Sequence, residues 1–246
     1  CFDPVTGSRA ECSSETTEVP VDFFYPESLA GRSQYQSEIA EAADALAYFS
    51  SRLGPWRYGK AGFVSVPHPF NMEAASLVVL IDPRAAVHET VHHWWGNNVR
   101  IRSWGDFWIS EGLTTYFTGF YNEARTGVNN ACSITTRTLD VHAPQDPLDL
   151  FNNDAYCIGA AAIADYRDRL ARWLERDPRD PEAVSAFLSV FRAVYESLEG
   201  TAANTASFSS ALSRSSGLSV RTVSTVRPVQ FGNAAVLAMA PAVQRA

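Results

Sequence analysis

The stretch "HETVHHWW" (88–95) places three histidines and one glutamate close together. On an α-helix, residues four apart lie about 40° from each other around the axis, one turn along. His88 and His92 would therefore share one face, whereas His93 lies about 100° from His92 and points elsewhere. Glu89 lies about 60° from His92, beside the pair. This is the H-E-x-x-H pattern of zinc proteases, in which two imidazoles bind the metal and the glutamate acts as base on a metal-activated water.

The residues around this motif favour a helix. Asp82 at an N-cap, followed by Pro83 at the first helical position, is a strong start signal. Gly96 follows Trp95 at the place where a left-handed glycine would end a helix. The sequence therefore predicts a helix over 83–95. Because a five-residue match to H-E-x-x-H also arises by chance, the pattern needs a third ligand.

A catalytic zinc takes three protein ligands and keeps one position open. Glu111 follows His92 after eighteen intervening residues. The loop 96–106 contains Gly and Asn residues that permit a chain reversal, and Ser110 is a candidate N-cap for a helix that runs to Gly127. Two antiparallel helices would then bring Glu111 against the histidines. The alternative is that Glu111 is a charge in the first helical turn, favoured by the helix dipole.

The two segments that carry these residues resemble one known family. "HWWGNNV" (93–99) and "WISEGLTTYF" (108–117) are similar to the "HQWFGN.V" and "WLNEGFA.Y" segments of the zinc aminopeptidases of the aminopeptidase N and leukotriene hydrolase family. The similarity covers about residues 35–220 and includes "YFSSRLGPWRYGKAGFVSVP" (48–67), "NMEAASLVVL" (71–80), "YCIGAAAIADYRDRL" (156–170) and "FSSALSRSSGLSV" (208–220). Three positions depart from the usual pattern, with Ala74 for Asn, Phe70 for Gly and Ile158 for Lys.

The resemblance implies an α+β fold, a thermolysin-like catalytic domain with a small N-terminal sheet followed by a mainly helical lobe. This gluzincin domain would span 35–220, between an N-terminal loop segment (1–34) and a C-terminal tail (221–246). Periodicity predicts a helix over 36–53 with an apolar face formed by Ile39, Ala42, Leu46, Phe49 and Leu53. Strands are expected in "AGFVSVP" (61–67) and "SLVVLI" (76–81). Further helices are expected at 110–126, 130–142, 155–175, 181–198 and 206–215, with a Pro/Asp-rich loop at 142–154.

The resemblance also implies a role for each candidate residue. Glu89 would be the general base beside one zinc ion per chain, held by His88, His92 and Glu111. Tyr156, at the place of the family's Y-x-K-G tyrosine, would stabilise the oxyanion; the alternative is an ordinary core tyrosine. Glu73, with Met72, would hold the substrate's α-ammonium group; the alternative is an exposed charge at a strand edge.

The remaining histidine of the motif, His93, is expected to pack with Trp94 and Trp95 and to donate a hydrogen bond. The function that follows is zinc-dependent hydrolysis of peptide bonds, with release of amino-terminal residues. The alternative is a zinc-bearing, catalytically weak family member that binds peptides or partners as a scaffold. Glu89 favours the enzyme, since a scaffold needs no base. Two features favour the scaffold: Ala74 replaces the family's Asn, and the similarity does not include the family's N-terminal β-domain.

Composition narrows the other possibilities. A chain of 246 residues with 46% hydrophobic residues can bury a large core. A net charge of −7 argues against nucleic-acid binding, and no stretch has the length of a membrane span. The resemblance makes peptides the expected partners, and the oligomeric state stays open. None of the four cysteines forms a C-x-x-C pair. Pairing of Cys1 with Cys12 and of Cys132 with Cys157 would indicate a bacterial cell envelope or secreted location; free thiols would leave the cytoplasm open.

Overall fold

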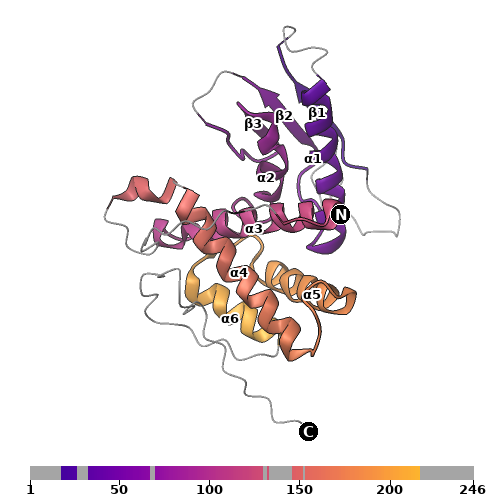
Figure 1. The fold of residues 1–246 in the computed structure, drawn as a ribbon. Helices are drawn as coiled ribbons and strands as arrows, with labels where there is room; N and C mark the ends of the chain where they lie inside the picture. Colours follow the sequence, from indigo (N-terminus) through magenta and orange to yellow (C-terminus); the bar gives the residue numbers. More distant parts are fainter. Residues whose placement is uncertain are drawn as a thin grey trace. The chain divides into compact units, whose positions relative to one another are not determined.

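The structure is a computed structural model that describes residues 18–26, 33–66, 70–129, 132, 146–151 and 153–216 (Figure 1). The chain divides into two compact units, with the boundary between His93 and Trp94. Several predictions lie outside the described residues: the loop up to residue 17, the Cys1–Cys12 pairing, the helix at 130–142 apart from Cys132, the loop residues up to 145 and the tail 221–246. Within the described part, no helix has the length and apolar character that crossing a membrane requires.

The first unit contains a three-stranded parallel sheet, β1 (Val21–Phe24), β2 (Ala61–Ser65) and β3 (Leu77–Leu80), in that order. The predicted strands at 61–67 and 76–81 are confirmed as β2 and β3. β1 corrects the prediction of a loop up to residue 34. Its two end residues are exposed and its two middle residues are half-buried, so the strand shows no alternation of buried and exposed positions. It is defined by its pairing with β2, which the local sequence does not encode.

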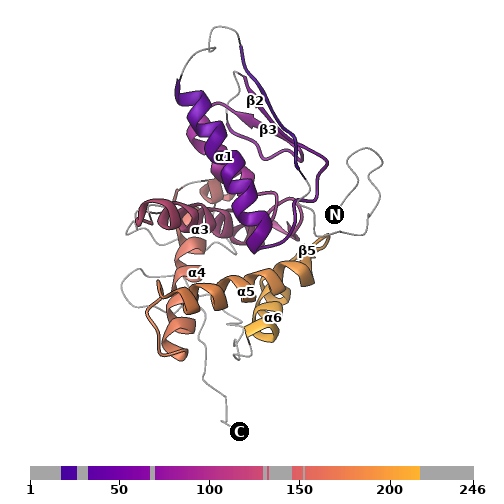
Figure 2. The same cartoon turned by 90° about the vertical axis from the view of Figure 1, so that its right-hand side faces the viewer.

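The helix α1 (Ser33–Arg52) connects β1 to β2 and lies alongside the sheet (Figures 1 and 2). A parallel strand pair needs such a crossover connection. The predicted helix over 36–53 is confirmed, with an earlier start. Most of its expected apolar face is buried, with at most 5% exposure for Ala42, Leu46, Phe49 and Leu53. This face packs against α2 (Ala86–Val91).

The beginning of the motif helix is confirmed, but its end is not. Asp82 accepts a hydrogen bond from the Arg84 N–H at 3.0 Å, and Pro83 begins a short 3-10 turn, η2 (Pro83–Ala85), that leads into α2. The expected helix end at residue 95 is wrong, because α2 ends at Val91. The His93 N–H donates to the Thr90 carbonyl at 3.2 Å, a three-residue step that tightens the chain beyond the helix.

The second unit is mainly helical. Its long helices are α3 (Phe107–Thr126), α4 (Asn153–Trp173), α5 (Pro181–Leu198) and α6 (Thr205–Ser216), where α3 packs on α4 and α5 on α6 (Figures 1 and 2). The short elements are β4 (Arg100–Ile101), paired with β5 (Ala202–Ala203), and the 3-10 turns η3 (Trp104–Asp106) and η4 (Pro147–Phe151). The helices predicted at 155–175, 181–198 and 206–215 are confirmed as α4, α5 and α6, with ends shifted by one or two residues.

The start of α3 corrects the prediction that Ser110 caps it. The helix begins at Phe107, and Ser110 is a buried residue of its first turn. Asp106 stands at the N-cap position and accepts hydrogen bonds from the Thr205 N–H at 2.9 Å and from the Ser103 hydroxyl at 2.7 Å. Asp106 makes no side-chain capping bond to α3 and instead connects the start of this helix to a residue of α6 that is distant in sequence. The predicted end is confirmed by the left-handed Gly127 (φ 78°).

Two covalent or close contacts hold α4 in place. A disulfide joins Cys132 to Cys157, with their Cα atoms 5.5 Å apart, as the local pairing predicted. Gly112 of α3 and Gly159 of α4 face each other so closely that an ideal Cβ on Gly112 would lie 2.4 Å from the Gly159 Cα. The two backbones therefore touch at this point, which only glycine permits.

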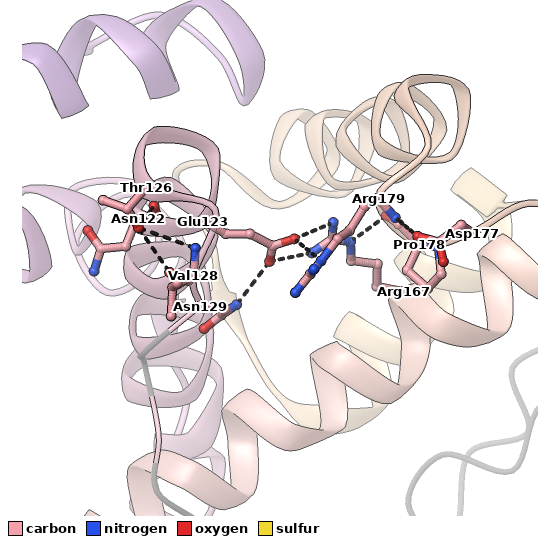
Figure 3. Close-up of polar contacts among 9 residues, drawn as sticks. All are labelled: Asn122, Glu123, Thr126, Val128, Asn129, Arg167, Asp177, Pro178 and Arg179. Carbon is pink, nitrogen blue, oxygen red and sulfur yellow. Dashed lines mark hydrogen bonds and ion pairs between the residues drawn. The ribbon is translucent and has the colours of Figure 1, made fainter.

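A buried ion pair joins α3 and α4 further along (Figure 3). The Arg167 guanidinium donates to both carboxylate oxygens of Glu123, at 2.9 and 3.1 Å, and to the Pro178 carbonyl at 3.0 Å. The Asn129 amide donates to Glu123 at 3.4 Å, and Arg179 lies 3.4 Å from the same carboxylate. Burial alone would raise the pKa of Glu123, but the hydrogen bonds and charge of Arg167 outweigh it and lower that pKa.

We expect Glu123→Gln to lower the free energy of unfolding by about 3 kcal/mol at pH 7, because it leaves the Arg167 charge buried beside a neutral amide. The pKa of Glu123 is lower in the folded state, so the pair contributes fully above the ordinary value of 4.5. Its contribution is lost as the pH falls below that value through the folded-state pKa. Urea unfolding of wild type and variant at pH 7 and pH 3 measures both effects.

The matched control is Glu196→Gln on α5, which removes the same charge from an exposed pair with Arg192. We expect at most about 0.5 kcal/mol there, because such surface helix pairs are weak. Equal losses for the two variants, or a loss for Glu123→Gln that does not shrink at pH 3, would contradict the structural role of the buried pair.

Candidate metal centre

Three side chains predicted to bind a metal come together. One ligand atom from each of His88, His92 and Glu111 lies within 4.8 Å of the others, and this is the one such group of three or more among the described residues. The Nε2 atoms of His88 and His92 are 3.2 Å apart, with their rings nearly perpendicular at 83°. Two nitrogens on a tetrahedral zinc, each at 2.0–2.1 Å, would be about 3.3 Å apart. Two imidazoles and a carboxylate in this arrangement therefore fit a zinc ion.

The helix α2 explains the placement of the histidine pair. His88 lies within the helix and His92 follows its last residue, four positions on, so the shared face predicted from the periodicity is confirmed. The face beside the pair is apolar, with Val87 and Val91 at most 5% exposed. His92 is itself 1% exposed, which removes competing water from one side of the group.

Glu89 lies on α2 next to His88 and is 6% exposed. Glu111 lies in the second turn of α3 and is 7% exposed. A buried carboxylate is costly unless it is paired or binds a metal. Both carboxylates therefore need a charged or polar partner. The alternative for Glu111, a solvated charge in the first turn of a helix, does not agree with this burial.

Tyr156, the predicted oxyanion donor, lies on α4 and is half-buried. Its ring meets the ring of Phe107 edge-on at 5.9 Å. Cys157, the next residue, carries the disulfide, and Gly159 forms the close contact with Gly112 of α3. Ile158, at the family's lysine position, is 5% exposed. The backbone contact places Tyr156 on the same part of the α3–α4 pair as Glu111.

Glu73 and Met72, the predicted substrate residues, lie just before β3. Met72 forms an antiparallel bridge with Val79, through two hydrogen bonds of 2.9 Å, and its side chain is 36% exposed. Glu73 follows it and is half-buried. This partial burial does not decide between substrate binding and a charge at a strand edge, so the role of Glu73 stays a prediction.

His93 was expected to donate a hydrogen bond and to pack with Trp94 and Trp95, and this packing stays a prediction. Its Nδ1 donates to the Glu89 carbonyl at 3.1 Å, which confirms the expected hydrogen bond. Its ring contacts Trp56 and Tyr58, at centroid distances of 4.4 and 5.0 Å, neither of which the sequence suggested. Burial lowers the pKa of His93 to about 4, so the ring is neutral at pH 7.

Sequence reasoning missed the Gly112–Gly159 contact. Glycine inside a helix costs about 1 kcal/mol relative to alanine. A glycine inside a helix often has a packing reason, so two such glycines could have indicated the contact. One lies next to a predicted ligand, and the other lies three residues after the predicted catalytic tyrosine.

Part of the chain is similar in sequence to known proteins. Residues 83–145 match the model of the Peptidase family M1 domain. Aminopeptidase B of Rattus norvegicus is 27% identical over 139 residues, which are 49% of this chain and 21% of that protein. Leukotriene A-4 hydrolase of Xenopus laevis is 33% identical over 91 residues, 32% of this chain and 15% of that protein. The aligned regions thus span about a fifth or less of these curated relatives.

Solved structures share the fold. The M1 zinc metallopeptidase from Deinococcus radiodurans matches with a TM-score of 0.63 and 21% identity, over 84% of this chain and 47% of that one. A mutant of it bound to a Tyr-Ser-Ala substrate matches with a TM-score of 0.60 and 22% identity, over 72% of this chain and 41% of that one. The predicted α+β fold with a small sheet and a helical lobe is confirmed. The matched segment, the relatives and the shared fold agree with the resemblance found in the sequence: residues 83–145 are similar to the Peptidase family M1 domain, and the described fold is that of solved M1 zinc metallopeptidases.

Proposed function

We propose that this chain is a zinc-dependent peptidase domain that releases amino-terminal residues from peptides. The observation that carries the proposal is the group formed by His88, His92 and Glu111, with Glu89 adjacent on α2. Relatives named as aminopeptidases and a neighbour bound to a tripeptide substrate support peptides as the substrate class. One zinc ion per chain would be held by the three ligands.

When bound, the zinc would act as a Lewis acid that polarises the scissile carbonyl and lowers the pKa of the attacking water towards neutrality. Glu89 supplies the base. Its carboxylate accepts the proton of the attacking water and passes it to the leaving amine, so that one group serves both halves of the reaction. Its burial, at 6% exposure, keeps bulk water from competing for the proton.

Tyr156 supplies a neutral hydrogen-bond donor. As negative charge develops on the carbonyl oxygen, its hydroxyl donates to that oxygen. The half-buried position on α4 suits this role, because the ring is held by packing against Phe107 while part of the side chain stays accessible.

Glu73 makes the enzyme an aminopeptidase. Nothing in a metal, a water and a base limits cleavage to a chain end, so a further group must recognise the free amine. A carboxylate in a partly buried place does this with a charge-assisted hydrogen bond of about 1.5–3 kcal/mol. At about 1.4 kcal/mol per tenfold, the preference for a free over a blocked amine is roughly ten- to a hundredfold.

The second candidate is a catalytically weak scaffold that binds peptides. Ala74, which follows Glu73, offers no polar side chain, and Ile158 buries an apolar group two residues after Tyr156. Both departures reduce the polar groups available for the peptide terminus. The two functions differ in turnover, since a scaffold binds free-amine peptides without cleaving them.

We expect the chain to cleave a peptide with a free amino terminus about tenfold better, in kcat/KM, than its acetylated form. The preference should fall to about one in Glu73→Ala, because the carboxylate that binds the amine is gone. Turnover should disappear with a chelator and return with added zinc. Rates of release of the first residue measure all three.

Asp44→Ala is the control, because it removes an exposed carboxylate from α1 in the same unit and should keep the preference. Equal kcat/KM for free and acetylated peptides in the wild type would turn the proposal towards an endopeptidase. Peptide binding without any zinc-dependent turnover would favour the scaffold.

A further inference from the structure

His93 connects two segments of the first unit through its ring. Its Nδ1 lies 3.1 Å from the Glu89 carbonyl oxygen, and the Ser76 N–H points at its Nε2 over 3.3 Å. A carbonyl oxygen only accepts and a backbone N–H only donates, so Nδ1 carries the proton and Nε2 offers its lone pair. The ring is thereby held as one neutral tautomer with both nitrogens used.

Aromatic packing fixes the ring between these two partners. The Trp56 ring lies over it at 4.4 Å with an interplanar angle of 30°, and the Tyr58 ring meets it edge-on at 5.0 Å. His93 is 2% exposed, so water does not replace either partner. The distance between Ser76 and Glu89 is therefore set by the width of one imidazole.

The hydrogen bonds of His93 link Glu89 to Ser76, and Ser76 lies in a turn with an unfavourable backbone conformation. Ser76 has φ 61°, a left-handed conformation that residues other than glycine keep only where their surroundings enforce it. The Gly62 N–H donates to the Ser76 carbonyl at 2.8 Å, and the Leu77 N–H donates to the Ala74 carbonyl at 3.0 Å. His93 accepts a hydrogen bond from the Ser76 N–H, and this bond joins the turn to the segment after α2.

Glu73 lies directly before this turn. On its other side, Met72 and Val79 exchange two backbone hydrogen bonds of 2.9 Å. The backbone of Glu73 is consequently held between a strand bridge and the turn at Ser76. Since His93 ties that turn to the Glu89 carbonyl, it ties Glu73 to the helix that carries the base.

We propose that His93 is a positioning residue, which sets the place of Glu73 relative to Glu89 by linking the turn at Ser76 to α2. The proposal rests on the proposed function, in which Glu73 binds the substrate amine and Glu89 takes the proton of the attacking water. The link would fix how far the bound amino terminus lies from the bond that is cleaved.

Two variants separate this role from ordinary core packing. His93→Phe keeps an aromatic ring against Trp56 and Tyr58 but loses both hydrogen bonds. His93→Gln keeps one acceptor and one donor on a side chain of similar reach. We expect His93→Phe to lower kcat/KM for a free-amine peptide about tenfold, mainly through a higher KM, and to leave the acetylated peptide unaffected. His93→Gln should restore most of the preference.

The acetylated peptide is the internal control. A general loss of packing slows both peptides equally, whereas a displaced Glu73 affects only the free amine. A second readout needs no activity: amide exchange of Ser76 should be faster in His93→Phe and close to wild type in His93→Gln. In the wild-type protein, nitrogen-detected NMR of the ring should find the proton on Nδ1 and none on Nε2.

The outcomes are distinct. An unchanged ratio of free to acetylated kcat/KM in a zinc-loaded His93→Phe protein would overturn the positioning role. A proton on Nε2 would overturn the link itself, even where the phenylalanine variant does not fold. A wild-type ratio of one, with the expected tautomer and exchange, would instead reject the assigned role of Glu73 in the proposed function.

Discussion

Glu89→Gln should keep one zinc per chain and lose nearly all peptide turnover. The amide has the size of the carboxylate, so the buried site at 6% exposure stays filled. It cannot accept the proton of the attacking water, and loss of a general base typically costs about a hundred- to ten-thousandfold in rate. Because ground-state binding of the peptide does not use this proton, the loss should fall on kcat and leave KM nearly unchanged.

Glu89→Asp is the matched variant, since it keeps a basic carboxylate but shortens the side chain by one methylene. We expect its kcat to lie between those of the wild type and the glutamine variant. Elemental analysis of all three proteins, purified without chelators, should give the same zinc content. A glutamine variant with half the wild-type kcat would show that Glu89 is not the base, and wild-type protein that holds no zinc even after its addition would remove the metal from the mechanism.

The candidate metal ligands could be predicted from the sequence because most of the information is local. The four-residue spacing of His88 and His92 fixes a shared face on any helix. Glu111 required one further assumption, a chain reversal between two helices, and the group of ligand atoms within 4.8 Å of one another agrees with it. The start of the first helix followed from Asp82 and Pro83, whose capping interaction is equally local.

Features that depend on contacts distant in sequence were not predictable in this way. β1 pairs with β2, and Asp106 at the start of α3 accepts a hydrogen bond from the Thr205 N–H of α6. Both contacts join residues that are far apart in the sequence. His93 shows the same limit inside the site. Its own hydrogen bond could be expected, but its acceptor role towards Ser76, seventeen residues away, depends on where the sheet places that turn.

The packing of α3 on α4 was only partly predictable. Both helices were expected from their sequences, but not the point at which they touch. An added Cβ at Gly159 would lie 2.6 Å from the Gly112 Cα, so each glycine matters only in the presence of the other. This pairwise dependence cannot be read from either segment alone, yet it determines how Tyr156 is placed relative to Glu111.

That placement leads to a second large effect, in Tyr156→Phe. The ring is retained against Phe107, and the backbone contact three residues on is untouched, so the fold and the zinc should remain. The hydroxyl that would donate to the developing oxyanion is lost. Removal of one such donor costs about a hundred- to a thousandfold in kcat, with little change in KM, because the interaction strengthens only as charge develops.

Tyr166→Phe is the matched control on the same helix. It removes a hydroxyl from a tyrosine that is fully buried among the helices of the second unit, next to Phe187 and Phe191, and it should leave kcat and KM at wild-type values. Steady-state kinetics of the three proteins on one free-amine peptide decide between the two interpretations of Tyr156. A kcat for Tyr156→Phe equal to that of the control would make it an ordinary packing tyrosine. A selective fall in kcat would require its hydroxyl to act on the reacting carbonyl, since the ring, the disulfide at Cys157 and the contact of α4 with α3 are the same in both variants.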